Sequence, residues 1–304
     1  MPQFVLAHLS DVHLTPPARA WGASDLFTKR LFSRLSWTRA RRFEHRPEVL
    51  DSIVSDLRAQ APDHVAITGD LTNFAAADEI AAARSWLERL GPARDVTVSL
   101  GNHDCLVQVS PGAATQWLDW LGDGLSRPEF PAVRERDGVA LVNACSSLPT
   151  RAFSAEGELG ATQLERLRTV LSQLGAQGRF RILLIHHPVA QGVVSRRKAL
   201  RDAAALREML AETGAELVLH GHGHEAAVSA VAGPHGPIPV LGIPSASAAP
   251  GHRHAPARWR RIEIDTSADA PVVMVTERGY EEGEEGVRDL GSYRLAIPRR
   301  PPAA

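Results

Sequence analysis

Residues 3–13 read QFVLAHLSDVH: a short apolar run is followed at once by Asp11 and His13, two residues whose side chains bind metal ions. The apolar run predicts a buried strand. Successive side chains of a strand point to opposite faces, so residues i and i+2 share a face. We therefore expect Asp11 and His13 to point together from the carboxyl end of a strand.

Four further motifs repeat this arrangement, each directly after a short apolar run. They are Gly69-Asp70, Gly101-Asn102-His103-Asp104, His186-His187 and Gly221-His222-Gly223-His224. Continuous apolar runs are typical of buried strands, and open α/β sheets place their ligand sites beyond the carboxyl ends of the strands. The five motifs are therefore expected to meet in one crevice.

The number of candidate ligands exceeds what a single metal ion needs. A zinc site uses three or four protein ligands, whereas the motifs supply seven candidate ligands. The candidates are Asp11, His13, Asp70, Asn102, His186, His222 and His224. The surplus predicts a centre of two ions about 3.5–4 Å apart, which hold the attacking and leaving oxygens of a displacement. Asp70 is the expected bridge, because its motif contains no other ligand. Mixed Asp, Asn and His ligands favour manganese, iron, cobalt or zinc over calcium.

In this order, the motifs resemble the calcineurin-like metallophosphoesterase superfamily, whose pattern is D-x-H, GD, GNH-[DE], H and GHxH. The resemblance spans residues 4 to 265. It implies an α/β fold, a four-layer αββα sandwich of two mixed sheets flanked by helices. The helical insertion expected after the first strand departs from the compact members of the family. The implied activity is that of a phosphoric diester hydrolase with two divalent metal ions.

The resemblance also implies a role for each residue. One ion takes Asp11, His13, Asp70 and His224, and the other takes Asp70, Asn102, His186 and His222. His103 remains unligated and is expected to stabilise the transition state or to protonate the leaving oxygen. The nucleophile would be a hydroxide that bridges the two ions.

Four further residues are candidates for supporting roles. Asp104 is expected to orient His103 or to cap a following helix. Only one of His186 and His187 can face the metals, because adjacent strand residues point apart; the family uses the first. His252 and His254 repeat the spacing of the ligand pair, and a surface loop is favoured over a loop that contacts substrate.

Composition limits the class of protein. The chain has 304 residues, of which 44% are hydrophobic, so one metallophosphoesterase domain over residues 1–298 with a tail at 299–304 is expected. Two cysteines do not make a disulfide framework, which favours a reducing compartment. No signal peptide and no apolar stretch of 18 residues are found, so we expect a cytoplasmic protein. Any contact with the membrane is expected to be peripheral, at its inner face.

Periodicity predicts helices between the motifs and strands after them. The expected helices are 47–60, 76–90, 162–174 and 199–212, and the expected later strands are 226–232, 238–241, 259–264, 271–276 and 292–297. The acidic stretch 277–291 is expected to be a solvated loop.

The segment 19–46 carries a charge opposite to that of the rest of the chain. It contains eight basic and two acidic residues, a local charge of +6 in a chain of net charge −1. Between Leu26 and Leu35 the apolar residues share one side of a helix, which gives a basic amphipathic insertion. Ordinary packing on the domain is the leading interpretation, contact of residues 26–46 with an anionic membrane surface comes second, and nucleic-acid contact is least favoured.

The substrate is the least constrained property. The basic insertion, together with Ala61-Pro62-Asp63-His64, Ile67-Thr68-Gly69-Asp70 and Gly242-Ile243-Pro244-Ser245-Ala246-Ser247, resembles the bacterial lipid-remodelling phospholipase C branch, whose members are typically manganese-dependent. A glycerophospholipid is therefore the favoured substrate. The alternatives are a cyclic nucleotide such as 3′,5′-cAMP or a glycerophosphodiester. A non-catalytic, protein-binding scaffold is disfavoured, because no motif residue is lost.

Overall fold

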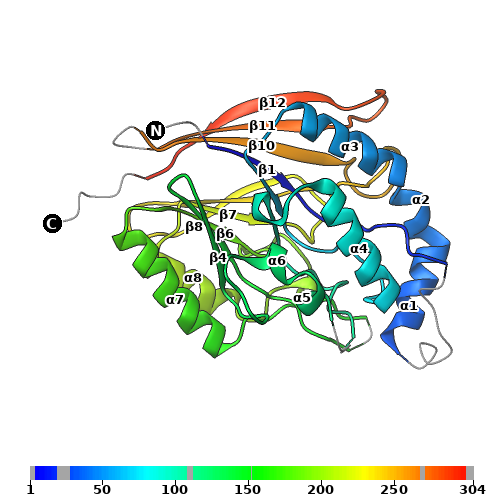
Figure 1. Ribbon diagram of the computed structural model, residues 1–304, viewed down its shortest axis with the longest axis horizontal. Coiled ribbons are helices and arrows are strands. Elements are labelled where there is room, and N and C mark those ends of the chain that lie inside the picture. The colour runs from blue at the N-terminus through cyan, green and yellow to red at the C-terminus, as the bar shows by residue number, and fades with distance from the viewer. Residues whose placement is uncertain (1–3, 19–27, 108–111, 152, 268–270, 299–304) are drawn as a thin grey trace.

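Two mixed β-sheets form the centre of the protein. The computed structural model describes residues 4–18, 28–107, 112–151, 153–267 and 271–298 (Figure 1). Within these residues, the first sheet has the strand order β12-β11-β10-β1-β2-β3 and the second has the order β4-β5-β6-β7-β9-β8. The first sheet contains β1 (Phe4–Leu9), β2 (His64–Ile67), β3 (Val96–Val98), β10 (Arg258–Asp265), β11 (Val272–Gly279) and β12 (Arg288–Leu295). The second contains β4 (Ala132–Arg136), β5 (Val139–Asn143), β6 (Phe180–Leu184), β7 (Leu217–His220), β8 (Ala227–Val231) and β9 (Ile238–Gly242).

The parallel strands of each sheet lead towards the motifs. Strands β1, β2 and β3 are parallel neighbours, and β5, β6, β7 and β9 form a parallel run in the second sheet. The remaining pairs are antiparallel. Each of the five motifs follows the carboxyl end of one parallel strand: β1, β2, β3, β6 or β7.

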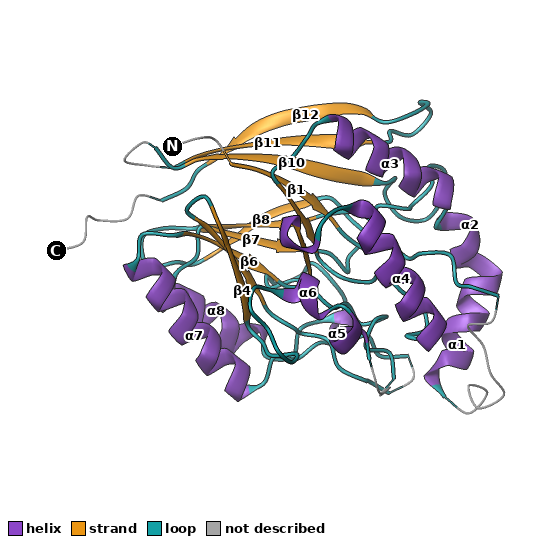
Figure 2. Cartoon of the chain, in the orientation of Figure 1, coloured by secondary structure: helices purple, strands orange, loops and turns teal. Residues whose placement is uncertain are grey.

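Three apolar clusters define four layers. Helices α3 (Pro47–Ala59) and α4 (Ala77–Leu90) pack on the outer face of the first sheet, where Ile53 and Ile80 are fully buried. Helices α7 (Ala161–Ala176) and α8 (Ala203–Thr213) cover the outer face of the second sheet (Figure 2). A third cluster, which includes Leu6 and Leu184, lies between the sheets. The predicted αββα sandwich is confirmed.

Local sequence explains where the helices start. Helix α3 begins with Pro47, whose fixed φ and missing N–H suit the first turn, and its Leu50, Ile53 and Leu57 recur at helical spacing and are buried. Before α4, the carboxylate of Glu79 accepts the backbone N–H groups of Asn73, Phe74 and Ala76. This carboxylate fixes the loop that follows the Gly69-Asp70 motif.

Two expectations about elements need correction, and one pair of strands was not expected. The helix predicted from residue 199 begins at Ala203, because Leu200 pairs instead with Gly157 in a short bridge. The acidic loop predicted over 277–291 is shorter, since β11 continues to Gly279 and β12 begins at Arg288. Glu277 lies within β11 because its carboxylate binds the guanidinium groups of Arg258 and Arg260. The hairpin β4–β5 was not predicted.

The basic insertion is helical where it is described. It comprises α1 (Lys29–Ser36), the π-helical turn η2 (Trp37–Arg41) and the short α2 (Arg42–Glu44). Residues 19–27 of the insertion and the predicted tail 299–304 lie outside the described residues. The short elements η3 (Ala93–Asp95), α5 (Ala113–Gln116), α6 (Leu118–Leu121) and η4 (Arg196–Lys198) complete the list. Among the described residues, no helix combines the length and apolarity needed to span a membrane.

Candidate metal centre

The predicted ligands gather into two groups at the carboxyl ends of the parallel strands. The side chains of Asp11, His13 and His224 form the first group, in which His224 Nε2 lies 3.1 Å from Asp11 Oδ1. The second group is Asp70, His186 and His222. Within each group the candidate ligand atoms lie within 4.8 Å of one another. The expected convergence of the motifs is therefore present.

Asn102 and Asp70 connect these groups. The Asn102 Oδ1 atom lies 3.2 Å from His186 Nε2, which adds the amide oxygen to the second group. Asp70 Oδ2 lies 3.4 Å from His186 Nε2 and 3.9 Å from His13 Nε2. One carboxylate oxygen thus faces both groups, the geometry that a bridging ligand requires.

The backbone at these motifs is left-handed, which the strand argument did not anticipate. Positive φ angles occur at Asp11 (51°), His13 (43°), Asp70 (56°), His222 (65°) and His224 (57°). Strand β1 ends at Leu9 and β7 ends at His220, so none of these residues is on a strand. Asp11 does lie near His13, and His222 near His224, as expected. The predicted cause, alternation of side chains along a strand, is wrong. Strained loop backbone, which is common at functional sites, brings them together instead.

Backbone carbonyls fix the orientation of three histidine rings. His186 Nδ1 donates to Thr68 O at 2.7 Å, and His13 Nδ1 approaches Thr72 O at 3.3 Å. His222 Nε2 donates to Lys198 O at 3.0 Å. Because a carbonyl can only accept, the opposite ring nitrogens point into the site, where they are the atoms that would bind a metal ion. This is the usual support for a metal-binding histidine.

The electrostatics of the cluster suit divalent cations. Burial raises the pKa of Asp11 and of Asp70, but neighbouring histidines outweigh this effect and hold both values below the usual range, so both groups are carboxylates. Burial lowers the pKa of His186, yet Asp70 and Asp11 raise it to about 9. Asp11 is buried, and its Oδ1 lies 3.1 Å from His224 Nε2 and 4.0 Å from His13 Nε2. Anionic oxygens and oriented imidazoles at this spacing fit the expected metal ions.

His187 lies beside the cluster with both ring nitrogens occupied. Its ring centroid is 4.4 Å from that of His222. Ser146 Oγ lies 2.8 Å from His187 Nδ1, and Ala155 O accepts from Nε2 at 3.2 Å. Strand β6 ends at Leu184, so these contacts, and not strand alternation, set His187 apart from His186.

Asp104 has neither of the roles expected for it. Its carboxylate accepts from the backbone N–H groups of Asp70, Thr72 and Gly101 at 2.8–2.9 Å. The residues after it, up to position 107, form turns and no helix. His103 is oriented instead by Asn73, whose carbonyl accepts from Nδ1 at 2.8 Å.

Arg41 is a site residue that sequence reasoning missed. Its Nη1 lies 3.1 Å from His103 Nε2, and its Nη2 lies 2.8 Å from His13 Nε2. Burial and this guanidinium together lower the pKa of His103 to about 3. The only available signal was its place in the basic segment after the first motif.

Glu44, His45 and His254 form a border beside the first ligand group. The carboxylate of Glu44 contacts His254 Nδ1, and the His254 ring centroid lies 5.0 Å from that of His224. His45 is buried, with its ring centroid 4.4 Å from that of His13. His254 thus lies in a loop next to the site, whereas His252 is exposed, and contact of either residue with substrate stays a prediction.

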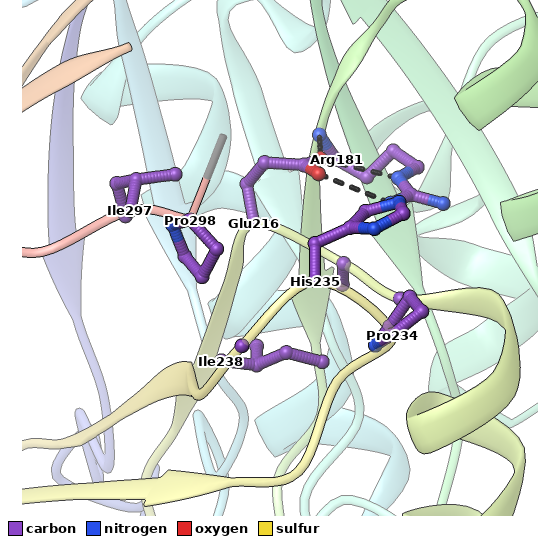
Figure 3. A pocket seen from close by; sticks show the side chains of 10 residues that line it. Arg181, Glu216, Pro234, His235, Ile238, Ile297 and Pro298 are labelled. Atoms are coloured by element: carbon purple, nitrogen blue, oxygen red, sulfur yellow. Dashed lines mark hydrogen bonds and ion pairs between the residues drawn. The ribbon is translucent and has the colours of Figure 1, made fainter. Parts of the chain in front are cut away.

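A small cavity elsewhere in the fold does not overlap this cluster. It lies where β6 and β7 begin, and Arg181, Glu216, Pro234, His235, Ile297 and Pro298 are among its lining residues (Figure 3). The guanidinium of Arg181 is fully engaged by Glu216 and by the carbonyls of Leu171 and Thr213. This buried ion pair has a structural role.

Comparisons with known proteins agree with the motif pattern. A probable cyclic nucleotide phosphodiesterase of Synechococcus is 27% identical over 70% of this chain and 76% of its own length. A cAMP/cGMP dual-specificity phosphodiesterase of Mycobacterium tuberculosis is 29% identical over 73% of this chain, but the match spans only 62% of that protein. A dimetal phosphatase from Danio rerio has a similar fold, with a TM-score of 0.59 at 14% identity, and covers 98% of this chain and 99% of its own. The calcineurin-like phosphoesterase family model matches residues 4–226, and the chain therefore belongs to that family.

Proposed function

We propose that this protein is a binuclear metal-dependent phosphodiesterase. The observation that carries this proposal is the position of Asp70, whose Oδ2 faces His186 at 3.4 Å and His13 at 3.9 Å. Asp11, His13 and His224 would hold one ion, and Asn102, His186 and His222 the other, with Asp70 shared. When bound, two divalent ions supply Lewis acidity and an activated water for attack on phosphorus. Manganese is the favoured metal.

The protein's own residues position the reacting groups. Carbonyls of Thr68, Thr72 and Lys198 hold the imidazoles in one orientation. His103 lies at the edge of the cluster, where its backbone N–H donates to Asp70 Oδ1 at 2.7 Å. Its ring is the group that would face the phosphoryl oxygens and stabilise the charge that develops there.

The favoured substrate is a glycerophospholipid, cleaved in the manner of a phospholipase C. The insertion that reaches the site with Arg41 also exposes Phe32, Leu35 and Phe43. The ring of Phe32 contacts that of Phe153, which is 72% exposed, at a centroid distance of 4.8 Å. We call Phe32, Leu35, Phe43 and Phe153 the apolar rim. Exposed aromatic residues among arginines are typical of surfaces that enter an anionic lipid interface, so peripheral contact with the inner face of the membrane is part of this proposal.

A cyclic nucleotide is the second candidate substrate. The specific observation in its favour is that the two curated relatives are named as phosphodiesterases of cyclic nucleotides. Both substrates are phosphodiesters, and the same two-metal centre would hydrolyse either of them.

A substrate panel separates these candidates. Purified protein with Mn²⁺ is assayed on bis(p-nitrophenyl) phosphate, phosphatidylcholine vesicles, 3′,5′-cAMP, glycerophosphocholine and single-stranded DNA. We expect hydrolysis of bis(p-nitrophenyl) phosphate and of the vesicles. The Phe32→Ser/Phe153→Ser variant should lose about 100-fold in the rate on vesicles only, because the two phenyl rings each contribute on the order of 1.5 kcal/mol to insertion.

The matched control is Val228→Ser, which changes a 60% exposed apolar residue on β8. This variant should match the wild type on every substrate. Robust cAMP turnover without vesicle hydrolysis would remove the lipid proposal. Absence of Mn²⁺-dependent hydrolysis of any phosphodiester would remove the phosphodiesterase proposal as well.

A further inference from the structure

Arg41 ends the π-helical turn of the insertion and extends its guanidinium into the candidate metal centre. Nη2 lies 2.9 and 2.8 Å from the two ring nitrogens of His13. Nη1 lies 3.3 and 3.1 Å from those of His103. Each Nη atom thus lies within 3.3 Å of one imidazole ring, Nη2 beside His13 and Nη1 beside His103. One cation therefore spans a predicted metal ligand and the predicted phosphoryl-facing histidine.

The turn that carries Arg41 is fixed on the opposite side by the segment 245–254. Ala249 N donates to Glu44 O at 2.8 Å, and Arg46 N donates to Ser247 O at 2.9 Å. His45 Nδ1 lies 3.0 Å from Ser247 Oγ, and Glu44 contacts His254. These four contacts of Glu44, His45 and Arg46 hold the chain three to five residues after Arg41. The fold therefore sets the position of Arg41 and directs its side chain towards the site.

The charge of Arg41 lacks a direct partner. Within the described residues, the guanidinium forms no ion pair, and its contacts are the two histidine rings. Burial lowers its pKa, while the more distant Asp70, Asp11, Glu44 and Glu79 raise it. An arginine stays protonated in proteins, so this partly buried cation retains an unmet demand for an anion. A phosphodiester monoanion bound beside His103 would meet it, because planar N–H pairs match phosphate oxygens in a bidentate manner.

From this placement we infer that Arg41 is a phosphate-binding residue, which donates to a non-bridging phosphoryl oxygen of the substrate beside His103. The inference rests on the proposed phosphodiesterase function. It explains why the basic insertion directly follows the first motif: the segment delivers a cation to the reacting group. Phosphate recognition by Arg41 does not depend on whether the ester is a phospholipid or a cyclic nucleotide.

The test compares Arg41→Ala, Arg41→Gln and Arg41→Lys with Arg39→Ala, an exposed arginine of the same turn. Arg41→Ala and Arg41→Gln should lose about 10²-fold in kcat/KM on bis(p-nitrophenyl) phosphate, the usual cost of removing one charge-stabilising donor. Mn²⁺ affinity and stoichiometry should stay within twofold of the wild type. Added guanidinium ion should partly restore Arg41→Ala and leave Arg39→Ala unaffected, and Arg41→Lys should retain an intermediate rate.

Two results would overturn the inference. One is an unchanged kcat/KM in Arg41→Gln. The other is tighter Mn²⁺ binding with equal or higher activity in Arg41→Ala, which would mean that the guanidinium only fills the space where a metal binds His13. A further measurement separates failure of this inference from failure of the phosphodiesterase proposal: calorimetric binding of inorganic phosphate to the Mn²⁺-loaded protein. If the wild type hydrolyses no diester, loss of phosphate binding in Arg41→Gln supports the inference and retained binding refutes it.

Discussion

The carboxylate of Asp104 accepts a hydrogen bond from the backbone N–H of Asp70, with a distance of 2.8 Å between Asp104 Oδ2 and Asp70 N. The same carboxylate accepts from the N–H groups of Gly101 and Thr72. The last residue of the third motif therefore fixes the backbone of the second. Because Asp70 has a left-handed φ of 56°, this hydrogen bond helps to hold a strained conformation.

Asp104→Ala should therefore weaken both folding and metal binding. The substitution leaves several buried donors without an acceptor, which costs about 3 kcal/mol in the free energy of unfolding. The backbone of Asp70 would also relax, so Mn²⁺ affinity should fall about 10-fold or more, as is usual when residues that support ligands are lost. Urea denaturation and Mn²⁺ titration measure the two effects. Asp51→Ala, an exposed carboxylate on α3, is the control and should change neither. Unaltered Mn²⁺ affinity in Asp104→Ala would contradict this account of Asp70.

Metal stoichiometry distinguishes the two ligand groups. Wild type should bind two Mn²⁺ per chain when saturated. His224→Ala should retain the ion of the Asp70, His186 and His222 group, and His222→Ala should retain the ion of the Asp11, His13 and His224 group. Asp70→Ala should weaken both, because its Oδ2 faces the two groups. Elemental analysis after gel filtration gives the counts. A wild-type count of one, or an Asp70→Ala protein that loses one ion only, would refute the shared-carboxylate arrangement.

His103→Ala should separate catalysis from metal binding. In the structure, His103 Nδ1 donates to Asn73 O at 2.8 Å, and its ring lies next to Arg41 and not among the ligand atoms. We expect two Mn²⁺ per chain and a kcat on bis(p-nitrophenyl) phosphate lower by about 10²-fold or more. His235→Ala, an exposed histidine of the remote cavity, serves as the matched control. A His103→Ala enzyme with nearly normal kcat would remove this residue from the chemistry.

The sequence allowed prediction of the fold and of the meeting point of the motifs, but not of the local backbone. Apolar runs before Asp11, Asp70 and His222 are strong signals, because a buried strand needs such a run. The left-handed φ angles at these residues leave no comparable pattern, since His and Asp also occur widely in ordinary backbone. Arg41 was equally hard to identify. Its contact with His103 depends on how a π-helical turn packs against residues more than 200 positions away, such as Ser247.

His64 offers a test that is independent of the metal centre. It is buried at the start of β2, where Nε2 lies 2.9 Å from Thr97 Oγ1 and Nδ1 has no partner among the described residues. Burial, with smaller contributions from Arg134 and Arg136, lowers the pKa of His64 to about 3.

Replacing His64 by Gln should flatten the loss of stability in acid. The unfolded chain protonates His64 near its ordinary pKa of about 6.5, whereas the folded protein resists protonation down to about pH 3. Between these values the unfolded state binds the extra proton, so the free energy of unfolding falls as the pH falls, by up to about 1.4 kcal/mol per pH unit from this residue. Urea denaturation at several pH values between 7.5 and 4.5 gives the slope for each protein. The other buried histidines contribute equally to the wild type and to His64→Gln, so the difference between the two slopes is the contribution of His64. Parallel stability curves for wild type and His64→Gln would show that this imidazole is not the source of the acid sensitivity.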